Sequence, residues 1–242
     1  MKTLLAGTSY IRNPYQLWIA EQWVRLGKLL NPNTDLLIVD SDSPLRPEDN
    51  LPDIRRTTIL QLGDNIGHLT YPAPYNKDGW GRATCEALDW AVDYDYVATI
   101  DLDVIYVDPV EPIFTWMAEN NIRVANPREP NYKWLEGITF WDTGYLKDSA
   151  FTSRYNWPSR GPQDSPQEYL MEGLMGEALT VIDLPGMRDD TNTLTPENLF
   201  MAFPSGISWL THCQNKAVYL TLMARYGIAP GPENTPDTPL IP

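Results

Sequence analysis

The sequence predicts a single α/β domain whose mainly parallel, Rossmann-like sheet is flanked by helices. Short continuous apolar runs suit buried parallel strands, and helical patterns alternate with them through residues 1–120. Strands joined by helices in this order form parallel sheets with right-handed crossovers. A chain of 242 residues is long enough to bury one such core.

The elements expected in residues 1–120 follow one another closely. The strands are expected at residues 3–10, 36–40, 57–62 and 96–100, and the helices at 14–27, at 80–92 and after a capping box at 108–111. The first helix opens at Asn13-Pro14, because Asn caps the free amides and Pro presets the φ of the first turn.

Residues 121–228 are less regular and are interpreted as a second half of the same domain. A strand is expected at 138–141, a long loop at 151–166, a helix from a capping box at 165–168 to Leu179, and a last helix at 217–226. Residues 229–242 hold repeated prolines and are expected to be an extended tail.

Charge and cysteine content narrow the possible partners. The net charge of −14 argues against nucleic acid and against an anionic membrane surface, because both require a basic face. Two cysteines without Cys-x-x-Cys spacing predict neither a structural zinc nor a disulfide framework.

No apolar run approaches the ~20 residues of a membrane span, and the N-terminal apolar run is too short for a signal peptide. We therefore expect a cytoplasmic protein.

The candidate chemistry lies at Asp101-Leu102-Asp103, directly after an apolar strand. In an open parallel sheet, ligands bind at the carboxyl ends of the strands. Two carboxylates spaced two residues apart on an extended segment point to the same side and can share one hard divalent cation. Such a cation can bridge the two phosphates of a nucleotide diphosphate. The alternative is that both carboxylates only end the strand and accept bonds from backbone amides.

In these segments the sequence resembles the GT-A glycosyltransferases, over roughly residues 3–220. The segments that carry the resemblance are 36–43 (LLIVDSDS), 79–83 (GWGRA), 96–103 (YVATIDLD), 141–145 (WDTGY) and 211–216 (THCQNK). Segment 141–145 is similar to the family's acceptor-side Asn-Thr-Gly segment, with Asp142 in place of Asn. Segment 211–216 resembles the late His and Lys of glycogenin-like members.

The resemblance implies a site for a nucleotide-sugar and a metal. Asp103 would be the main metal ligand, Asp101 would contact ribose or metal, and His212 would be the third ligand; imidazole beside carboxylates favours Mn²⁺ over Mg²⁺. The remaining implied contacts are Thr8 and Tyr10 beside the base, Asp40 on the nucleoside, Arg82 on a phosphate or sugar, and Lys216 on a phosphate. Asp164 is the candidate base for an inverting reaction.

Each of these residues also has a structural alternative. Asp40 can cap a turn, and Arg82 can pair with Glu86 one helical turn later. His212 can be a structural histidine, and Asp164 can simply favour a helix N-terminus. Trp134, Trp141 and Trp157 can form an acceptor platform or belong to the core.

The resulting hypothesis is a metal-dependent hexosyltransferase that moves a sugar from a nucleotide-diphosphate donor, expected to be UDP-linked, to an acceptor hydroxyl. Whether the acceptor is a glycan, a lipid or a protein stays open, as does the stereochemistry. A sugar nucleotidyltransferase is the first alternative, although residues 7–12 lack its Gly-rich basic loop. A non-catalytic carbohydrate-binding protein on a degenerate transferase fold is the second.

Overall fold

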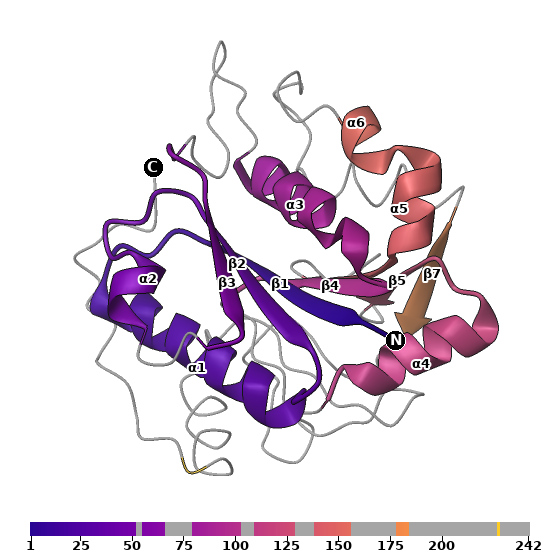
Figure 1. Ribbon diagram of the computed structural model, residues 1–242, viewed down its shortest axis with the longest axis horizontal. Coiled ribbons are helices and arrows are strands. Elements are labelled where there is room, and N and C mark those ends of the chain that lie inside the picture. Colours follow the sequence, from indigo (N-terminus) through magenta and orange to yellow (C-terminus); the bar gives the residue numbers. More distant parts are fainter. Residues whose placement is uncertain are drawn as a thin grey trace.

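The computed structural model describes residues 1–51, 55–65, 79–102, 109–128, 138–155, 178–183 and 227. Seven strands form one sheet in the order β3-β2-β1-β4-β6-β5-β7 (Figure 1). The strands are β1 (Thr3–Ser9), β2 (Asp35–Asp40), β3 (Thr57–Gln61), β4 (Tyr96–Ile100), β5 (Val124–Arg128), β6 (Ile138–Asp142) and β7 (Leu179–Asp183). The helices are α1 (Pro14–Leu30), α2 (Pro47–Asn50), α3 (Gly79–Trp90), the 3-10 helix η1 (Ala91–Asp93), α4 (Glu111–Asn120), α5 (Thr143–Ser149) and α6 (Phe151–Tyr155).

The sheet is mainly parallel, as the sequence predicts. β1 pairs in parallel with β2 and β4, and β2 pairs in parallel with β3. β6 runs antiparallel to both β4 and β5, and β7 runs parallel to β5. Among the described strands, β6 therefore runs against the other six. The carboxyl ends of β1 to β4 lie side by side at one end of the strands. We call this end of the sheet the C-edge; it is not an edge strand.

Two apolar layers cover the faces of the sheet. On one face, Leu5, Ile38 and Ile100 pack in a cluster with residues of α1 and α4. On the other face, Leu4 and Val39 pack in a cluster with residues of α3, α5 and α6. Figure 1 shows α1 and α4 on one side of the sheet and α3, α5 and α6 on the other. Adjacent strand residues point to opposite faces of the sheet, so a continuous apolar run supplies side chains to both apolar layers.

The helix ends differ in detail from the predictions. Asn13 caps α1 as expected, its side chain accepting from the N–H of Gln16 at 2.9 Å, but the helix continues past Gly27 to Leu30. The capping box expected at 108–111 is wrong, because α4 begins at Glu111 with Val110 as its N-cap and without a side-chain cap. The side chain of Asn31, at the end of α1, accepts from the Val110 N–H at 2.7 Å instead.

Residues 121–228 contain strands that the sequence pattern does not predict. β5 contains Asn126 and Pro127, residues that ordinarily argue against a strand interior. Asn126 is nevertheless buried, and its side-chain amide donates to the Ile138 carbonyl at 2.6 Å. Leu179 begins β7 rather than ending a helix, and Phe151 begins α6 where a loop was expected.

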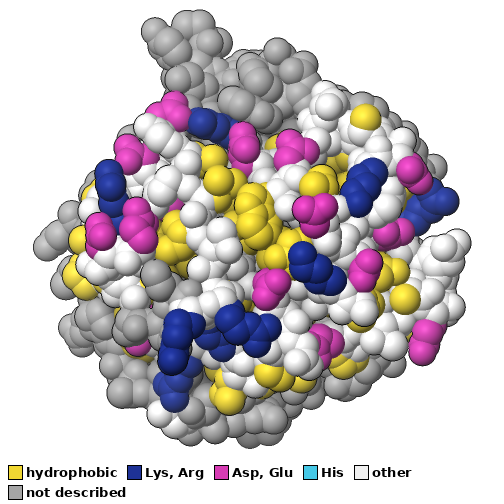
Figure 2. All heavy atoms as spheres, in the orientation of Figure 1, with side chains coloured by type: hydrophobic (Ala, Val, Ile, Leu, Met, Phe, Trp, Pro, Cys, Tyr) yellow, Lys and Arg dark blue, Asp and Glu magenta, His cyan; other side chains and the backbone are white. Residues whose placement is uncertain are grey.

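Charge is unevenly spread over the face shown in Figure 2. Acidic side chains are scattered across it. One group of Lys and Arg side chains lies at the lower left, over the region of α1, and other basic side chains lie at the upper left, in the centre and on the right. Within the described ranges, no helix is long and apolar enough to cross a bilayer.

Candidate functional site

The C-edge brings together the ends of strands that lie far apart in the sequence. Ser9 at the end of β1 pairs with Asp40 at the end of β2, and Asp40 pairs with Gln61 at the end of β3. Asp101 follows β4, which lies on the other side of β1. The predicted residues Thr8, Tyr10, Asp40 and Asp101 therefore share this edge.

Asp101 is held in place by two neutral donors. The Thr8 hydroxyl donates to Asp101 Oδ1 at 3.1 Å, and the indole Nε1–H of Trp80 donates to the same oxygen at 3.2 Å. Asp101 is half-buried, and its neighbours Ile100 and Leu102 are buried. A carboxylate in such a setting is oriented by its neighbours while its side chain stays partly open to the C-edge.

Gly7 makes room for the segment that carries Asp101. A Cβ at Gly7 would lie 2.2 Å from Leu102 Cδ1, 3.1 Å from the Ile100 carbonyl oxygen and 3.1 Å from Trp23 Cζ2. Real Cβ atoms do not approach other atoms to 2.2 Å, so the Leu102 side chain occupies the space that a side chain at residue 7 would need. Gly7 is thus needed for the position of the residues on both sides of Asp101.

Replacing Gly7 with alanine is expected to lower the free energy of unfolding by about 1–3 kcal/mol, because the added methyl overpacks Leu102 and Ile100. Gly63→Ala is the matched control, since a Cβ there would meet nothing within 4 Å. Chemical denaturation of both variants measures the difference. Equal stability of Gly7→Ala and Gly63→Ala would show that the end of β4 tolerates displacement.

Asp40 is the centre of a buried hydrogen-bond network. Its side chain has no exposed surface, and Oδ1 accepts from the Ser9 hydroxyl at 2.7 Å and from the Ser43 hydroxyl. Oδ2 accepts from the Ser43 backbone N–H at 3.0 Å, and the Ser43 hydroxyl oxygen accepts from the Ile11 N–H at 2.6 Å. These bonds tie the loops after β1 and β2 together. The turn-capping alternative accounts for the contacts of Asp40, whereas its nucleoside role stays a prediction.

Tyr10 and Arg12 lie in the loop between β1 and α1. Tyr10 is half-buried, and the Arg12 guanidinium carbon lies 5.7 Å from the centroid of its ring. The Gln16 side chain accepts from the Arg12 N–H at 2.8 Å, which fixes this loop to the first turn of α1. A tyrosine ring at this edge is compatible with the predicted place beside a base.

Arg82 lies in the first turn of α3 and points to the loop after β3. Its Nη1 lies 2.5 Å from Asp64 Oδ1; the Arg82 side chain is 20% exposed and the Asp64 side chain 62%. The sequence also allows Glu86 as a partner one helical turn later, but the ion pair is with Asp64. Arg82 is therefore at the C-edge and within reach of an anionic group there.

The segment 141–145 lies at the opposite edge of the sheet. Asp142 pairs with Tyr96 at the start of β4, whereas Ile138 pairs with Ile100 at its end. The five residues of β4 separate the two edges by roughly 13 Å. The assignment of Asp142 to the acceptor side is thus wrong in position, because β6 runs antiparallel to β4. The Asp142 side chain caps α5 instead, accepting from the Gly144 N–H at 2.9 Å.

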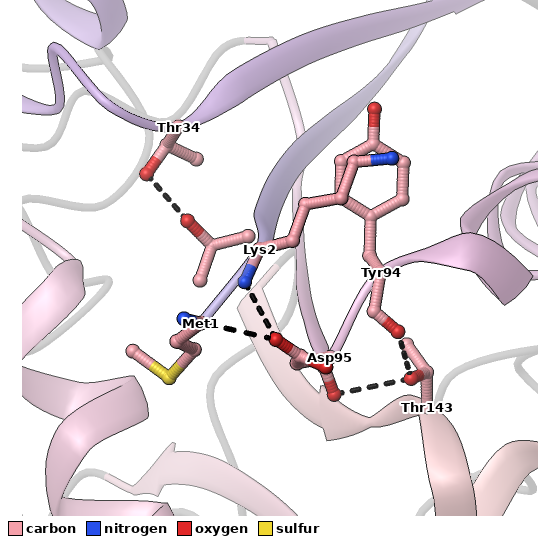
Figure 3. Close-up of polar contacts among 7 residues, drawn as sticks. Met1, Lys2, Thr34, Tyr94, Asp95 and Thr143 are labelled. Carbon is pink, nitrogen blue, oxygen red and sulfur yellow. Dashed lines mark hydrogen bonds and ion pairs between the residues drawn. The ribbon is translucent and has the colours of Figure 1, made fainter.

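Figure 3 shows the polar contacts at that opposite edge. The Lys2 N–H donates to Asp95 Oδ2 at 2.6 Å, and the Thr143 hydroxyl donates to the backbone carbonyls of Tyr94 and Asp95. Burial, together with a hydrogen bond from its hydroxyl to the Asp35 carboxylate, raises the pKa of Tyr94 to about 12. These contacts join the beginnings of β1, β4 and α5, so this edge is occupied by structural bonds.

Trp141 belongs to the core rather than to an acceptor platform. It is fully buried, its Nε1–H donates to the Thr99 hydroxyl at 3.1 Å, and its ring lies 5.1 Å from that of Phe151. Trp134 and Trp157 lie outside the described residues.

Four of the predicted site residues lie outside the described ranges: Asp103, Asp164, His212 and Lys216. Within those ranges, no three His, Cys, Asp or Glu side chains converge as a metal site. The metal therefore stays a prediction, and of its three predicted ligands Asp101 alone lies within the described residues. An oriented carboxylate oxygen is a ligand type that hard divalent cations prefer.

Sequence reasoning missed the residues that hold the two carboxylates. Ser9 and Ser43 bond Asp40, and Trp80 bonds Asp101. Ser43 had a local signal, since an Asp side chain often bonds residues that follow it closely in a turn. Ser9 had none, because it lies 31 positions from Asp40 in the sequence. Trp80 had none, because its partner is 21 positions away in the sequence.

The fold has counterparts among solved structures. No protein-family model and no curated protein sequence matches the chain. The galactosyltransferase LgtC, solved with donor and acceptor sugar analogs, matches with a TM-score of 0.55 at 11% identity, over 96% of this chain and 98% of LgtC. TarS from S. aureus matches with a TM-score of 0.52 at 15% identity, over 83% of this chain. The matched region is 62% of that TarS chain.

These likenesses define the fold: the chain shares the GT-A fold of LgtC and TarS. At identities this low, the likeness concerns the fold. The match with LgtC extends over nearly the whole length of both chains.

Proposed function

We propose that the chain is a metal-dependent glycosyltransferase that moves a sugar from a nucleotide-diphosphate donor, expected to be UDP-linked, to an acceptor hydroxyl. The observation that carries the proposal is the Asp101 carboxylate, which Thr8 and Trp80 hold at the C-edge of a GT-A sheet. In open sheets of this kind, ligands bind at this edge. LgtC, which shares the fold, was solved with donor and acceptor sugar analogs.

A divalent cation suits the charge of the protein. A diphosphate can bind to a chain with a net charge of −14 when a divalent cation is bound with it, because the cation offsets the repulsion between the negative charges. Asp101 and Asp103 with His212 would hold the cation, and this mixture of oxygen and nitrogen ligands favours Mn²⁺ over Mg²⁺. When bound, the cation would act as a Lewis acid that stabilises the diphosphate leaving group.

The residues of the first half would bind the donor. Tyr10 would lie beside the base, and Lys216 from the second half would contact a phosphate. Arg82 would exchange the exposed Asp64 carboxylate for a phosphate or sugar oxygen of the donor, since the planar guanidinium group can donate two hydrogen bonds to such oxygens. In this proposal, residues 1–120 form the donor half, residues 121–228 the acceptor half and residues 229–242 an extended tail.

The proton of the acceptor hydroxyl has two possible destinations. In an inverting reaction, the hydroxyl attacks the anomeric carbon from the side opposite the leaving group, and a carboxylate takes the proton; Asp164 is the candidate. In a retaining reaction, the hydroxyl attacks on the leaving-group side, and the departing diphosphate takes the proton.

Thermal unfolding with UDP, GDP and nucleoside triphosphates, each with and without Mn²⁺, tests the proposal. We expect stabilisation by a nucleoside diphosphate only when Mn²⁺ is present, because the cation joins the phosphates to the carboxylates. At a nucleotide concentration of about 100 times Kd the gain is about 2.7 kcal/mol. Asp103→Ala is expected to abolish the gain.

The same experiment separates the alternatives. A stabilising effect that Asp103→Ala leaves unchanged would contradict the metal site. Preference for a triphosphate with Mg²⁺ would favour a sugar nucleotidyltransferase, and the absence of any nucleotide effect would favour a non-catalytic carbohydrate-binding protein. Product analysis with a UDP-sugar then identifies the sugar and the stereochemistry.

A further inference from the structure

Two hydrogen bonds meet on one oxygen of Asp101. Thr8 Oγ1 and Trp80 Nε1 both donate to Oδ1, at 3.1 and 3.2 Å. Thr8 belongs to β1, and Trp80 to the first turn of α3, so the two donors reach Asp101 from different elements. The carboxylate is therefore oriented by parts of the fold that are fixed independently of the loop after β4.

The chemistry of the donors determines what they can do. An indole N–H donates and never accepts, and it does not titrate near neutral pH. An ionised carboxylate only accepts, so the Thr8 hydroxyl must also donate. Two donors use the two lone pairs of Oδ1 and restrict rotation of the carboxylate. The Asp101 carboxylate would then have one fixed orientation toward a bound cation.

Trp80 is itself immobilised. It is 9% exposed and belongs to the apolar cluster that α3 forms with the sheet. A tryptophan ring so deeply buried cannot swing away from Asp101 without exposing apolar surface. Two positions later in the same turn, Arg82 bonds Asp64 in the loop after β3. The first turn of α3 thus fixes both the Asp101 carboxylate and a cationic side chain at the C-edge.

We propose that Trp80 and Thr8 are positioning residues that hold the Asp101 carboxylate in the orientation in which it binds the divalent cation of the donor complex. This inference rests on the proposed function. Neither residue touches the reacting atoms; both act through Asp101. Partners of metal ligands that act in this way typically contribute about 10- to 100-fold to metal affinity.

The test measures Mn²⁺ and UDP binding by titration calorimetry and by the electron paramagnetic resonance signal of free Mn²⁺. Trp80→Phe keeps an aromatic ring but removes the N–H, and Thr8→Val keeps the shape but removes the hydroxyl. Each variant is expected to weaken Mn²⁺ binding in the presence of UDP by roughly 10-fold. Thr8→Ser, which keeps the donor, is expected to recover most of the affinity that Thr8→Val loses.

Trp90→Phe is the matched control, because Trp90 lies at the other end of the same helix and is 36% exposed. A double-mutant cycle excludes a merely structural role: in an Asp101→Ala background, Trp80→Phe should not weaken Mn²⁺ binding further. If Trp80→Phe unfolds the protein, Thr8→Val with its Ser counterpart carries the same test.

The outcomes separate this inference from the proposed function. Metal-dependent UDP binding in the unaltered protein, with unchanged Mn²⁺ affinity in Trp80→Phe and Thr8→Val, would overturn the positioning role and leave the proposed function standing. Absence of metal-dependent UDP binding in the unaltered protein would overturn both.

Discussion

Asp101→Asn is expected to weaken metal-dependent nucleotide binding strongly while leaving the fold intact. The asparagine Oδ1 can still accept from Thr8 and Trp80, so these two hydrogen bonds survive while the negative charge is removed. Loss of a direct carboxylate ligand should cost at least on the order of 100-fold in Mn²⁺ affinity, since loss of an indirect partner already costs about 10- to 100-fold. Titration calorimetry with Mn²⁺ and UDP measures this loss.

Asp142→Asn is the control for that change. Asp142 is the last residue of β6 and accepts from a backbone N–H, but it lies at the opposite edge of the sheet. Asparagine caps helices about as well as aspartate, so neither stability nor Mn²⁺ binding should change noticeably. Wild-type affinity in Asp101→Asn, or an equal loss in both variants, would place the cation somewhere other than the C-edge.

Much of the first half was predictable because local and tertiary preferences agree there. The run LLIVD at 36–40 is apolar on both faces, and a strand buried on both faces needs that pattern. Asn13-Pro14 starts α1 where capping chemistry places it. The position of Asp101 at the C-edge then follows from the parallel order of the strands.

The remaining errors arise from long-range pairing, which local patterns do not encode. Segment 141–145 has the composition of an acceptor-side turn, but the antiparallel direction of β6 carries it to the other edge. β5 holds a proline and a buried asparagine whose side-chain amide reaches the Ile138 carbonyl, so its sequence resembles a loop. Likewise, the bond between Trp80 and Asp101 depends on how α3 lies on the sheet.

Asp40→Ala is expected to destabilise the protein by about 3 kcal/mol, because it removes a buried acceptor that serves several donors at once. The Ser9 hydroxyl, the Ser43 hydroxyl and the Ser43 N–H all donate to this carboxylate. Buried donors left without a partner cost about 1–3 kcal/mol each, and the hydroxyls can rotate to relieve part of that cost. Asp49→Ala, at an exposed position of α2, should change stability by less than about 0.5 kcal/mol. Urea denaturation compares the two variants.

Asp40→Asn distinguishes the anchoring role from the nucleoside role. If Asp40 only anchors the loops, the asparagine side-chain oxygen can still accept from the Ser43 N–H. Its NH₂ group can donate to the serine hydroxyls, which can rotate to accept. Part of the stability is therefore retained. UDP affinity, measured well below the melting temperature, should then stay close to wild type. If Asp40 instead contacts the nucleoside, affinity falls sharply while stability is little changed. The fully buried position of Asp40 favours the first outcome, in which its carboxylate shapes the donor site by joining the loops after β1 and β2.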